Sequence, residues 1–227
     1  MAILKSSPPL TVGAINNPAA LETEICAADC DLVELRLDSL GNGPAVRAFA
    51  ERCASTAPVL ITARHPEEGG AGQYSATSRE SLLRSLLHLA GAIDIELRSL
   101  EELSAIWTEA SEQDLVRIAS YHDFKATPDL DSLRTRIDIA AEAGAEVAKF
   151  AFRINSPADL QTVVALMETE TPLPLSVMGM GPLAPSSRLL AVQLGSVLNY
   201  GYLGNEATAP GQWPAALLKQ VIAASRS

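Results

Sequence analysis

Short apolar segments recur along the whole chain and alternate with longer segments that have helical periodicity. Each short segment is rich in Val, Ile, Leu and Ala, a pattern typical of parallel strands that are covered by helices. Because 48% of the residues are hydrophobic but only 4% are aromatic, the core has to be built from aliphatic side chains. The predicted strands are residues 10–14, 32–37, 59–63, 93–97, 115–120, 146–150, 173–177 and 197–200.

The segments between these strands predict helices. Asn17 before Pro18, and Ser156 before Pro157, each place a proline directly after a capping residue, which is a strong start signal. The predicted helices include residues 18–28, 45–54, 78–90, 128–144, 156–169, 187–194 and 214–224. Eight strand and helix units in 227 residues predict an α/β fold, a (β/α)8 TIM barrel with residues 1–227 as a single domain. The alternative is an open doubly wound sheet, but its dinucleotide-binding form needs a Gly-x-Gly-x-x-Gly motif that the first strand lacks.

Charge and cysteine usage exclude several classes of protein. The formal net charge of −10 argues against a nucleic-acid binder, so an anionic ligand would be held by a few local arginines. Cys26, Cys30 and Cys53 do not have the spacing of a disulfide framework or a metal site, and the three histidines lack the short spacing of metal ligands. With neither a charged leader nor a run of 18 apolar residues, we expect a soluble cytoplasmic protein without membrane contact.

Lys149 and His122 each stand at the tail of an apolar segment. Lys149 lies in the predicted strand 146–150, where desolvation disfavours its ammonium form. Because a neutral amine attacks carbonyl carbons, Lys149 is a candidate for Schiff-base formation. The predicted helix 128–144 joins this strand to the one that precedes His122. The two side chains are therefore expected to meet at one mouth of the barrel.

Further polar residues stand at the carboxyl ends of the predicted strands, where barrels of this kind place their chemistry. Unpaired buried charge is costly, so such a group is better explained by an anionic ligand and catalysis than by stability. Structural roles stay open for single residues: Lys149 pairs with Glu34 or Glu96 or reaches the surface, and His122 is a satisfied structural residue. The residues at these ends are Glu34, Arg36, Arg64, Asp94, Glu96, His122, Asp123, Lys149, Ser176, Met178, Arg188, Thr208 and Gln212.

Seven short motifs follow one another at these strand ends. They are residues 31–38 (DLVELRLD), 62–70 (TARHPEEGG), 93–96 (IDIE), 120–124 (SYHDF), 146–151 (EVAKFA), 186–188 (SSR) and 209–212 (APGQ). With these motifs the chain resembles the type I 3-dehydroquinate dehydratases of the shikimate pathway over nearly its whole length. The resemblance implies a hydro-lyase that converts 3-dehydroquinate to 3-dehydroshikimate.

The resemblance also implies the catalytic roles. Lys149 matches the lysine that forms an imine with the substrate ketone, and His122 matches the general acid and base. Glu68, directly before Gly69 and Gly70, matches the carboxylate that orients the histidine, and this adjacency favours it over Glu67.

Substrate binding is implied for six further positions. Arg188 resembles the arginine that holds the substrate carboxylate, while Glu34, Arg36, Arg64, Thr208 and Gln212 resemble residues that bind substrate hydroxyls or order the pocket. No cofactor and no metal are implied, and a homodimer is expected from the resemblance alone. The segment 176–188 is longer than the family pattern, which leaves open whether Ser176, Met178 or Ser187 touches the ligand. The alternatives are another Schiff-base barrel enzyme of the class I aldolase type and a non-catalytic metabolite-binding barrel.

Overall fold

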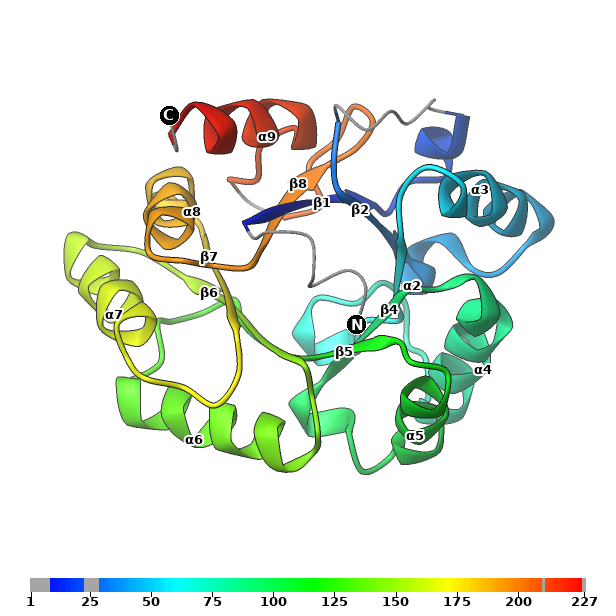
Figure 1. The fold of residues 1–227 in the computed structure, drawn as a ribbon, viewed down its shortest axis with the longest axis horizontal. Helices are drawn as coiled ribbons and strands as arrows, with labels where there is room; N and C mark the ends of the chain where they lie inside the picture. The colour runs from blue at the N-terminus through cyan, green and yellow to red at the C-terminus, as the bar shows by residue number, and fades with distance from the viewer. Residues whose placement is uncertain (1–8, 23–28, 210, 226–227) are drawn as a thin grey trace.

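The computed structural model describes residues 9–22, 29–209 and 211–225. Eight parallel strands form one sheet in the order β7-β6-β5-β4-β3-β2-β1-β8, and this sheet curves into a barrel (Figure 1). The strands are β1 Leu10–Ile15, β2 Leu32–Arg36, β3 Val59–Thr62, β4 Ala92–Glu96, β5 Val116–Asp123, β6 Val147–Arg153, β7 Leu175–Met180 and β8 Leu198–Tyr202. The strands β7 and β8 meet through a hydrogen bond of 2.6 Å from Ser176 Oγ to the Leu198 carbonyl. The predicted (β/α)8 barrel is confirmed.

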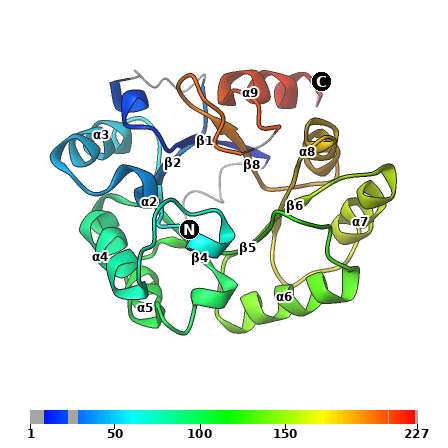
Figure 2. The same cartoon turned by 180° about the vertical axis from the view of Figure 1, so that it is seen from behind.

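Helices surround the barrel as an outer ring, which Figures 1 and 2 show from opposite sides. The α-helices are α2 Leu37–Leu40, α3 Pro44–Ala54, α4 Ala76–Leu86, α5 Ser104–Glu112, α6 Leu130–Glu142, α7 Pro157–Met167, α8 Ala184–Gln193 and α9 Ala215–Ala224. Short 3-10 helices are η1 Pro18–Glu22, η2 Pro66–Glu68, η3 Leu87–Leu89 and η4 Leu97–Ser99. Across the described ranges, no helix is long and apolar enough to span a bilayer.

Helix ends follow the capping signals of the sequence where these are strong. Pro157 is the first residue of α7, and Asp159 and Ser156 cap one another, with a hydrogen bond of 2.9 Å from the Ser156 N–H to Asp159 Oδ2. The predicted helix 18–28 is a 3-10 turn over its first five residues, and its remaining part, 23–28, lies outside the described residues. The helix α5 has no counterpart among the predicted helices; it buries Ile106, Trp107 and Ala110.

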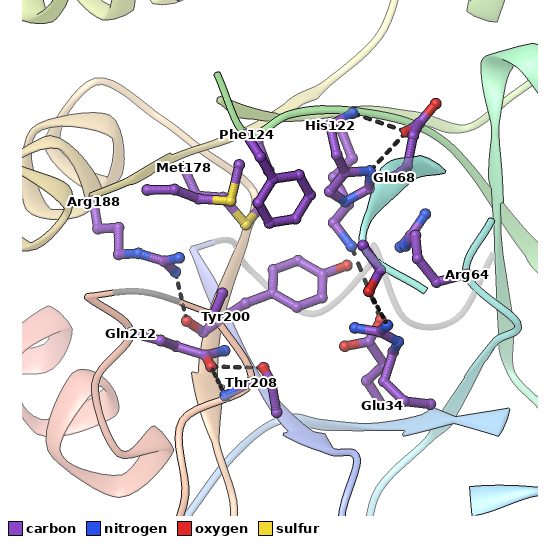
Figure 3. Close-up of a pocket in the computed structure, with 16 residues that line it drawn as sticks. Glu34, Arg64, Glu68, His122, Phe124, Met178, Arg188, Tyr200, Thr208 and Gln212 are labelled. Carbon is purple, nitrogen blue, oxygen red and sulfur yellow. Dashed lines mark hydrogen bonds and ion pairs between the residues drawn. The ribbon is translucent and has the colours of Figure 1, made fainter. Parts of the chain in front are cut away.

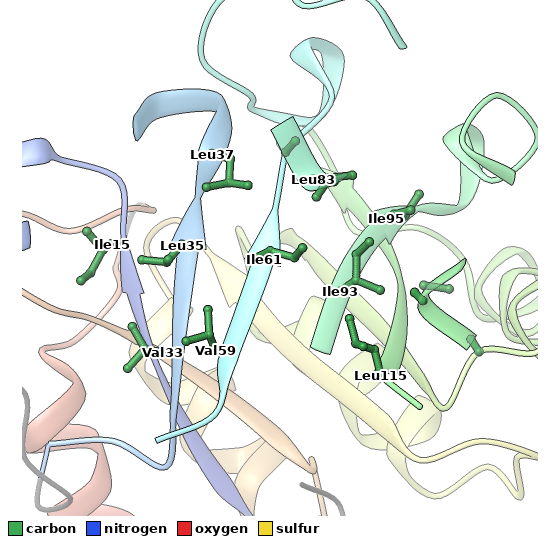
Figure 4. Close-up of a cluster of buried hydrophobic side chains, with 14 of the residues drawn as sticks. Ile15, Val33, Leu35, Leu37, Val59, Ile61, Leu83, Ile93, Ile95 and Leu115 are labelled. Carbon is green, nitrogen blue, oxygen red and sulfur yellow. The ribbon is translucent and has the colours of Figure 1, made fainter. Parts of the chain in front are cut away.

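Alternation along the strands separates two apolar clusters. Outward side chains such as Leu35 and Ile61 pack against the helices, for example against Leu83 of α4 (Figure 4). Inward side chains fill the barrel near the amino ends of the strands, and Val116 and Ile118 of β5 belong to this second cluster. Further along the same face, the inward residues become polar. The site is therefore built on an apolar base inside the barrel.

Three strands continue three residues beyond their predicted ends, which corrects the position of Lys149. The prediction ended these strands at Ser120, Phe150 and Val177, whereas β5, β6 and β7 extend to Asp123, Arg153 and Met180. Lys149 is therefore the third residue of β6 and lies inside the barrel, not at the strand end. The added residues continue the parallel pairing, with His122 opposite Ala151 and Phe152 opposite Gly179.

Candidate active site

One pocket at the carboxyl ends of the strands collects the residues that the sequence singles out (Figure 3). Every catalytic and binding candidate lines it, from six different strands and the loops that follow them. The lining residues are Glu34, Arg36, Arg64, Glu68, Gly69, His122, Phe124, Lys149, Ala151, Met178, Met180, Arg188, Tyr200, Thr208, Ala209 and Gln212. Because these residues line one pocket, they can act on the same ligand.

The strand register sets His122 and Lys149 on neighbouring strands at different depths. Ser120 of β5 pairs with Lys149 of β6, and His122 pairs with Ala151, two residues nearer the mouth. Since every second residue of a strand points inward, both side chains face the barrel interior and His122 lies one inward position above Lys149. A ligand entering from the mouth would reach the histidine first.

Lys149 is 3% exposed and lies between charged and aromatic groups. Its Nζ donates to Asp94 Oδ2 at 2.7 Å and lies 3.9 Å from Glu34 Oε1. The same nitrogen lies 4.0 Å from the centre of the Tyr200 ring, in a cation–π contact. The sequence suggested ion pairs with Glu34 or Glu96, but the partner from β4 is Asp94. The two carboxylates stabilise the ammonium form, which opposes the effect of desolvation.

Arg64 holds the carboxylates of β4 in place. Its Nη1 lies 2.9 Å from Asp94 Oδ1 and 2.8 Å from Glu96 Oε1, and it donates to Ser120 Oγ at 2.7 Å. Although burial by itself lowers the pKa of the guanidinium, Asp94 and Glu96 raise that pKa well above the usual value. For Asp94, burial by itself raises the pKa, and Arg64 and Lys149 reverse this and hold the pKa below its ordinary value. Arg64 is thus occupied by protein groups.

Arg79 of α4 extends this network from outside the barrel. It is 1% exposed, forms an ion pair with Glu96, and donates from Nε to the Ala63 carbonyl at 2.7 Å. Charges therefore alternate from Arg79 through Glu96, Arg64 and Asp94 to Lys149. The sequence did not single out Arg79, because an arginine on an amphipathic helix is usually exposed.

Glu68 and His122 form a second pair in the pocket. Glu68 Oε2 lies 3.0 Å from His122 Nδ1 and accepts the His122 backbone N–H at 2.9 Å. Burial raises the pKa of Glu68 to about 7, while the charge of Arg64 opposes this shift. Burial also lowers the pKa of His122 well below 6.5, and the charges of Arg64 and Lys149 add to that effect. The imidazole is therefore neutral near pH 7.

A tight loop after β3 brings Glu68, and not Glu67, to the histidine. Gly69 has φ of 84°, and a Cβ on Gly70 would lie 2.1 Å from the Arg64 carbonyl oxygen, so only glycine fits there. Glu68 is 5% exposed, whereas Glu67 points outward and pairs with Arg98 at 2.7 Å. The placement agrees with the choice made from the adjacent glycines.

Arg188 is a buried cation without a carboxylate partner among the described residues. From α8 it donates to the carbonyls of Gly179, at 3.2 Å from Nε, and Tyr200, at 2.9 Å from Nη1. Burial lowers the pKa of its guanidinium to about 10. A buried charge that is matched only by neutral carbonyls is well suited to an anionic ligand.

The remaining binding candidates are held by short-range contacts. Arg36 forms a two-point contact with Asp38, at 2.9 and 2.8 Å, and donates to the Gly69 carbonyl at 3.1 Å. Gln212 Oε1 accepts the N–H and the hydroxyl of Thr208, at 2.8 and 2.6 Å. This arrangement fixes the Gln212 amide group and leaves its NH2 group for other partners.

The three residues named for the long segment after β7 differ in their position relative to the pocket. Met178 lines the pocket. Ser176 and Ser187 are both buried and donate to backbone carbonyls, at 2.6 and 2.9 Å, and neither lines the pocket.

Phe124, Met180 and Tyr200 line the pocket without having been expected there. The sequence signal for Tyr200 was its inward alternation with Leu198 on the last strand. Among the residues described, no group of three or more His, Cys, Asp and Glu side chains comes together as a metal site would require.

A parallel barrel with this polar cluster at the carboxyl ends of its strands belongs to the (β/α)8 enzymes. The family model described as Type I 3-dehydroquinase matches residues 9–227. The chain therefore belongs to the type I 3-dehydroquinase family.

Individual relatives agree with this family. The chain is 32% identical to the 3-dehydroquinate dehydratase of Methanococcoides burtonii, with 94% of this chain and 93% of that protein covered. It is 34% identical to the 3-dehydroquinate dehydratase of Desulfotalea psychrophila, with 89% and 91% covered. The crystal structure of 3-dehydroquinate dehydratase from Geobacillus kaustophilus superimposes with a TM-score of 0.81 at 25% identity, and covers 97% of this chain and 92% of that one.

Proposed function

We propose that the protein dehydrates 3-dehydroquinate to 3-dehydroshikimate through an imine on Lys149. Membership of the type I 3-dehydroquinase family supports the reaction. The observation that carries the residue roles is the common pocket of Lys149, the Glu68 and His122 pair, and Arg188. Since the imine itself withdraws electrons, the reaction needs no cofactor.

Imine formation conserves the charge of the buried cluster. The ammonium of Lys149 and the substrate ketone give a protonated imine and water. Two of the ammonium protons leave with the ketone oxygen, and one stays on nitrogen. The nitrogen is thus positive before and after the step, and Asp94 and Glu34 neutralise it in both states. The same carboxylates that favour the ammonium form also stabilise the protonated imine.

His122 is the group that moves the proton of the adjacent carbon. Its Nδ1 is engaged by Glu68, and its Nε2 has no hydrogen-bond partner among the described residues. The neutral ring takes the proton from the carbon next to the imine, and the C–H electron pair shifts toward the positive nitrogen to give an enamine. The enamine then expels the neighbouring hydroxyl, which leaves as water with the proton from His122.

The pocket supplies groups for each part of a carboxylated cyclic polyol. Arg188 binds the substrate carboxylate, because it is buried and has no other negative partner among the described residues. Arg36, Thr208, Gln212 and Glu34 contact substrate hydroxyls. Arg64 orders the pocket, since its donors are already used by Asp94, Glu96 and Ser120.

The test of this function is borohydride reduction in the presence of 3-dehydroquinate, followed by peptide mass mapping. We expect an adduct on Lys149 and none on Lys125, an exposed lysine of the loop after β5. Lys149→Ala is expected to lose adduct and turnover, while Lys125→Ala keeps both. Turnover retained by Lys149→Ala would refute the imine mechanism.

A homodimer and a cytoplasmic location belong to the same proposal. The homodimer is expected from the family resemblance alone, and the cytoplasmic location is the expectation stated in the sequence analysis. Light scattering of the purified protein measures the mass in solution, and a mass of one chain would contradict the dimer. Fractionation of the source cells tests the location.

A further inference from the structure

Tyr200 is a buried pocket residue whose hydroxyl makes no hydrogen bond to the described residues. It lies on β8, points into the barrel and is 4% exposed. Within the described part of the chain, its hydroxyl is the one buried side-chain polar atom without a hydrogen-bond partner. A buried hydroxyl without a partner destabilises the fold, so such a group is expected to have a partner when ligand is bound.

The Tyr200 hydroxyl lies beside the reactive nitrogen of the proposed function. Lys149 Nζ lies 4.0 Å from the centre of the Tyr200 ring, yet no hydrogen bond joins Nζ to the hydroxyl. In Figure 3 the ring crosses the pocket and its hydroxyl points to the side where Arg64 and Glu34 lie. Lys149 and Tyr200 line the same pocket. A substrate atom bonded to Nζ would therefore lie against the face of the Tyr200 ring, near its hydroxyl.

The hydroxyl is a hydrogen-bond donor under all ordinary conditions. Burial raises the pKa of Tyr200 well above 10, and the negative charges of Glu34 and Asp94 raise this pKa further. Arg64, the cation beside Asp94, is bound to two carboxylates and Ser120, and Arg188 is assigned above to the substrate carboxylate. Tyr200 is thus a free donor beside the lysine.

We infer that Tyr200 is a further catalytic residue, whose hydroxyl donates a hydrogen bond to the substrate oxygen on the carbon that Lys149 attacks. This inference rests on the proposed function. Lys149 Nζ first passes one proton to Asp94 Oδ2, which lies 2.7 Å away. The lone pair thus freed forms the C–N bond while the C=O π pair moves to oxygen, and the Tyr200 hydroxyl stabilises the negative charge that develops there. The oxygen then receives one proton from the nitrogen and one from Asp94 and leaves as water, so one proton stays on the imine nitrogen and Tyr200 keeps its own.

The ring has a second part in the same step. Its face lies against the nitrogen that stays positive in the protonated imine, and an aromatic face attracts a cation. Hydroxyl and ring can be separated experimentally, because phenylalanine keeps the ring and removes only the oxygen.

The experiment compares the wild type, Tyr200→Phe and Tyr202→Phe in rapid mixing with saturating 3-dehydroquinate, followed by borohydride quenching at timed intervals. Tyr202 is the matched control, because it lies on the same strand but does not line the pocket. We expect adduct formation on Lys149 to slow about 10- to 100-fold in Tyr200→Phe, as for loss of one hydrogen bond to a developing charge. Tyr202→Phe is expected to match the wild type.

Each result has a defined meaning. An adduct rate in Tyr200→Phe within twofold of the wild type would overturn the role of Tyr200 and leave the proposed function intact. The absence of any adduct in the wild type would overturn the proposed function and the inference with it. A structural role is separated by thermal unfolding: we expect Tyr200→Phe to be at least as stable as the wild type, because the removed hydroxyl has no partner. A less stable variant with a normal adduct rate would show that Tyr200 serves the fold.

Discussion

Glu68 receives two hydrogen bonds from His122 on one carboxylate oxygen, at 2.9 Å from the backbone N–H and 3.0 Å from Nδ1. The backbone contact fixes the carboxylate against β5, and the ring contact then fixes the imidazole. A carboxylate can only accept, so the proton of the neutral ring lies on Nδ1 and the lone pair on Nε2. Orientation and tautomer of the histidine are therefore set by a single side chain.

The first prediction concerns the pH profile of activity. Protonation of Glu68 removes the acceptor that fixes His122, and burial raises the Glu68 pKa to about 7. We therefore expect kcat/KM to fall as pH drops below about 7 in the wild type. In Glu68→Gln this limb is absent and kcat is lower by about 10- to 100-fold, since the histidine is no longer oriented as a base. Steady-state assays from pH 5 to pH 9 measure both effects, and an unchanged limb in Glu68→Gln would contradict the assignment.

The second prediction concerns stability and the same group. Because the folded state raises the Glu68 pKa from 4.5 to about 7, Glu68 contributes stability below pH 4.5 that is lost as pH rises to about 7. The loss is about 3 kcal/mol for such a shift. Glutamine does not ionise, so Glu68→Gln is expected to gain stability relative to the wild type as pH rises from 5 to 8. Chemical denaturation across this range checks the sign, and a constant difference between the two proteins would be the contrary result.

A third prediction concerns Arg188. Lysine keeps its charge but cannot reproduce a two-point contact with a carboxylate, so Arg188→Lys is expected to raise KM about 10- to 100-fold with a smaller change in kcat. Arg98→Lys is the control, because Arg98 is exposed and pairs with Glu67 outside the pocket. Steady-state kinetics of the two variants measure KM and kcat. An unchanged KM in Arg188→Lys would mean that the substrate carboxylate binds elsewhere.

A fourth prediction tests the network that begins at Arg79. Arg79→Met leaves Glu96 buried with Arg64 as its only ion-pair partner among the described residues, and removal of one member of a buried pair costs about 3–5 kcal/mol. Arg84→Met is the matched control on the same helix: Arg84 is 45% exposed, and its surface pairs with Glu80 and Glu109 each contribute less than about 1 kcal/mol. Urea unfolding compares the free energies. Equal losses in the two variants would show that the buried network does not stabilise the fold.

Apolar periodicity predicted the barrel well, because parallel strands covered on both faces leave a clear aliphatic pattern. Strand ends were harder, since Asp123 and Arg153 are polar and still belong to strands that reach the mouth. The ion-pair partner of Lys149 was the hardest feature to predict. Asp94 rather than Glu96 contacts Lys149, and this depends on the register between neighbouring strands. Tyr200 carries no local signal of its role, because only the folded barrel shows that its hydroxyl has no partner.

The alternating charges from Arg79 to Lys149 link the reactive nitrogen to the outer helical ring through β3 and β4. The lysine proposed to form the imine is therefore also part of a charge network that holds the barrel to its helices. Replacing the lysine alone would leave Asp94 with Arg64 as its ion-pair partner and Glu34 without one among the described residues, so this replacement is expected to lower the stability of the fold. Loss of the lysine without loss of stability would require compensating replacements at these carboxylates. The buried charge network thus favours retention of the lysine during evolution.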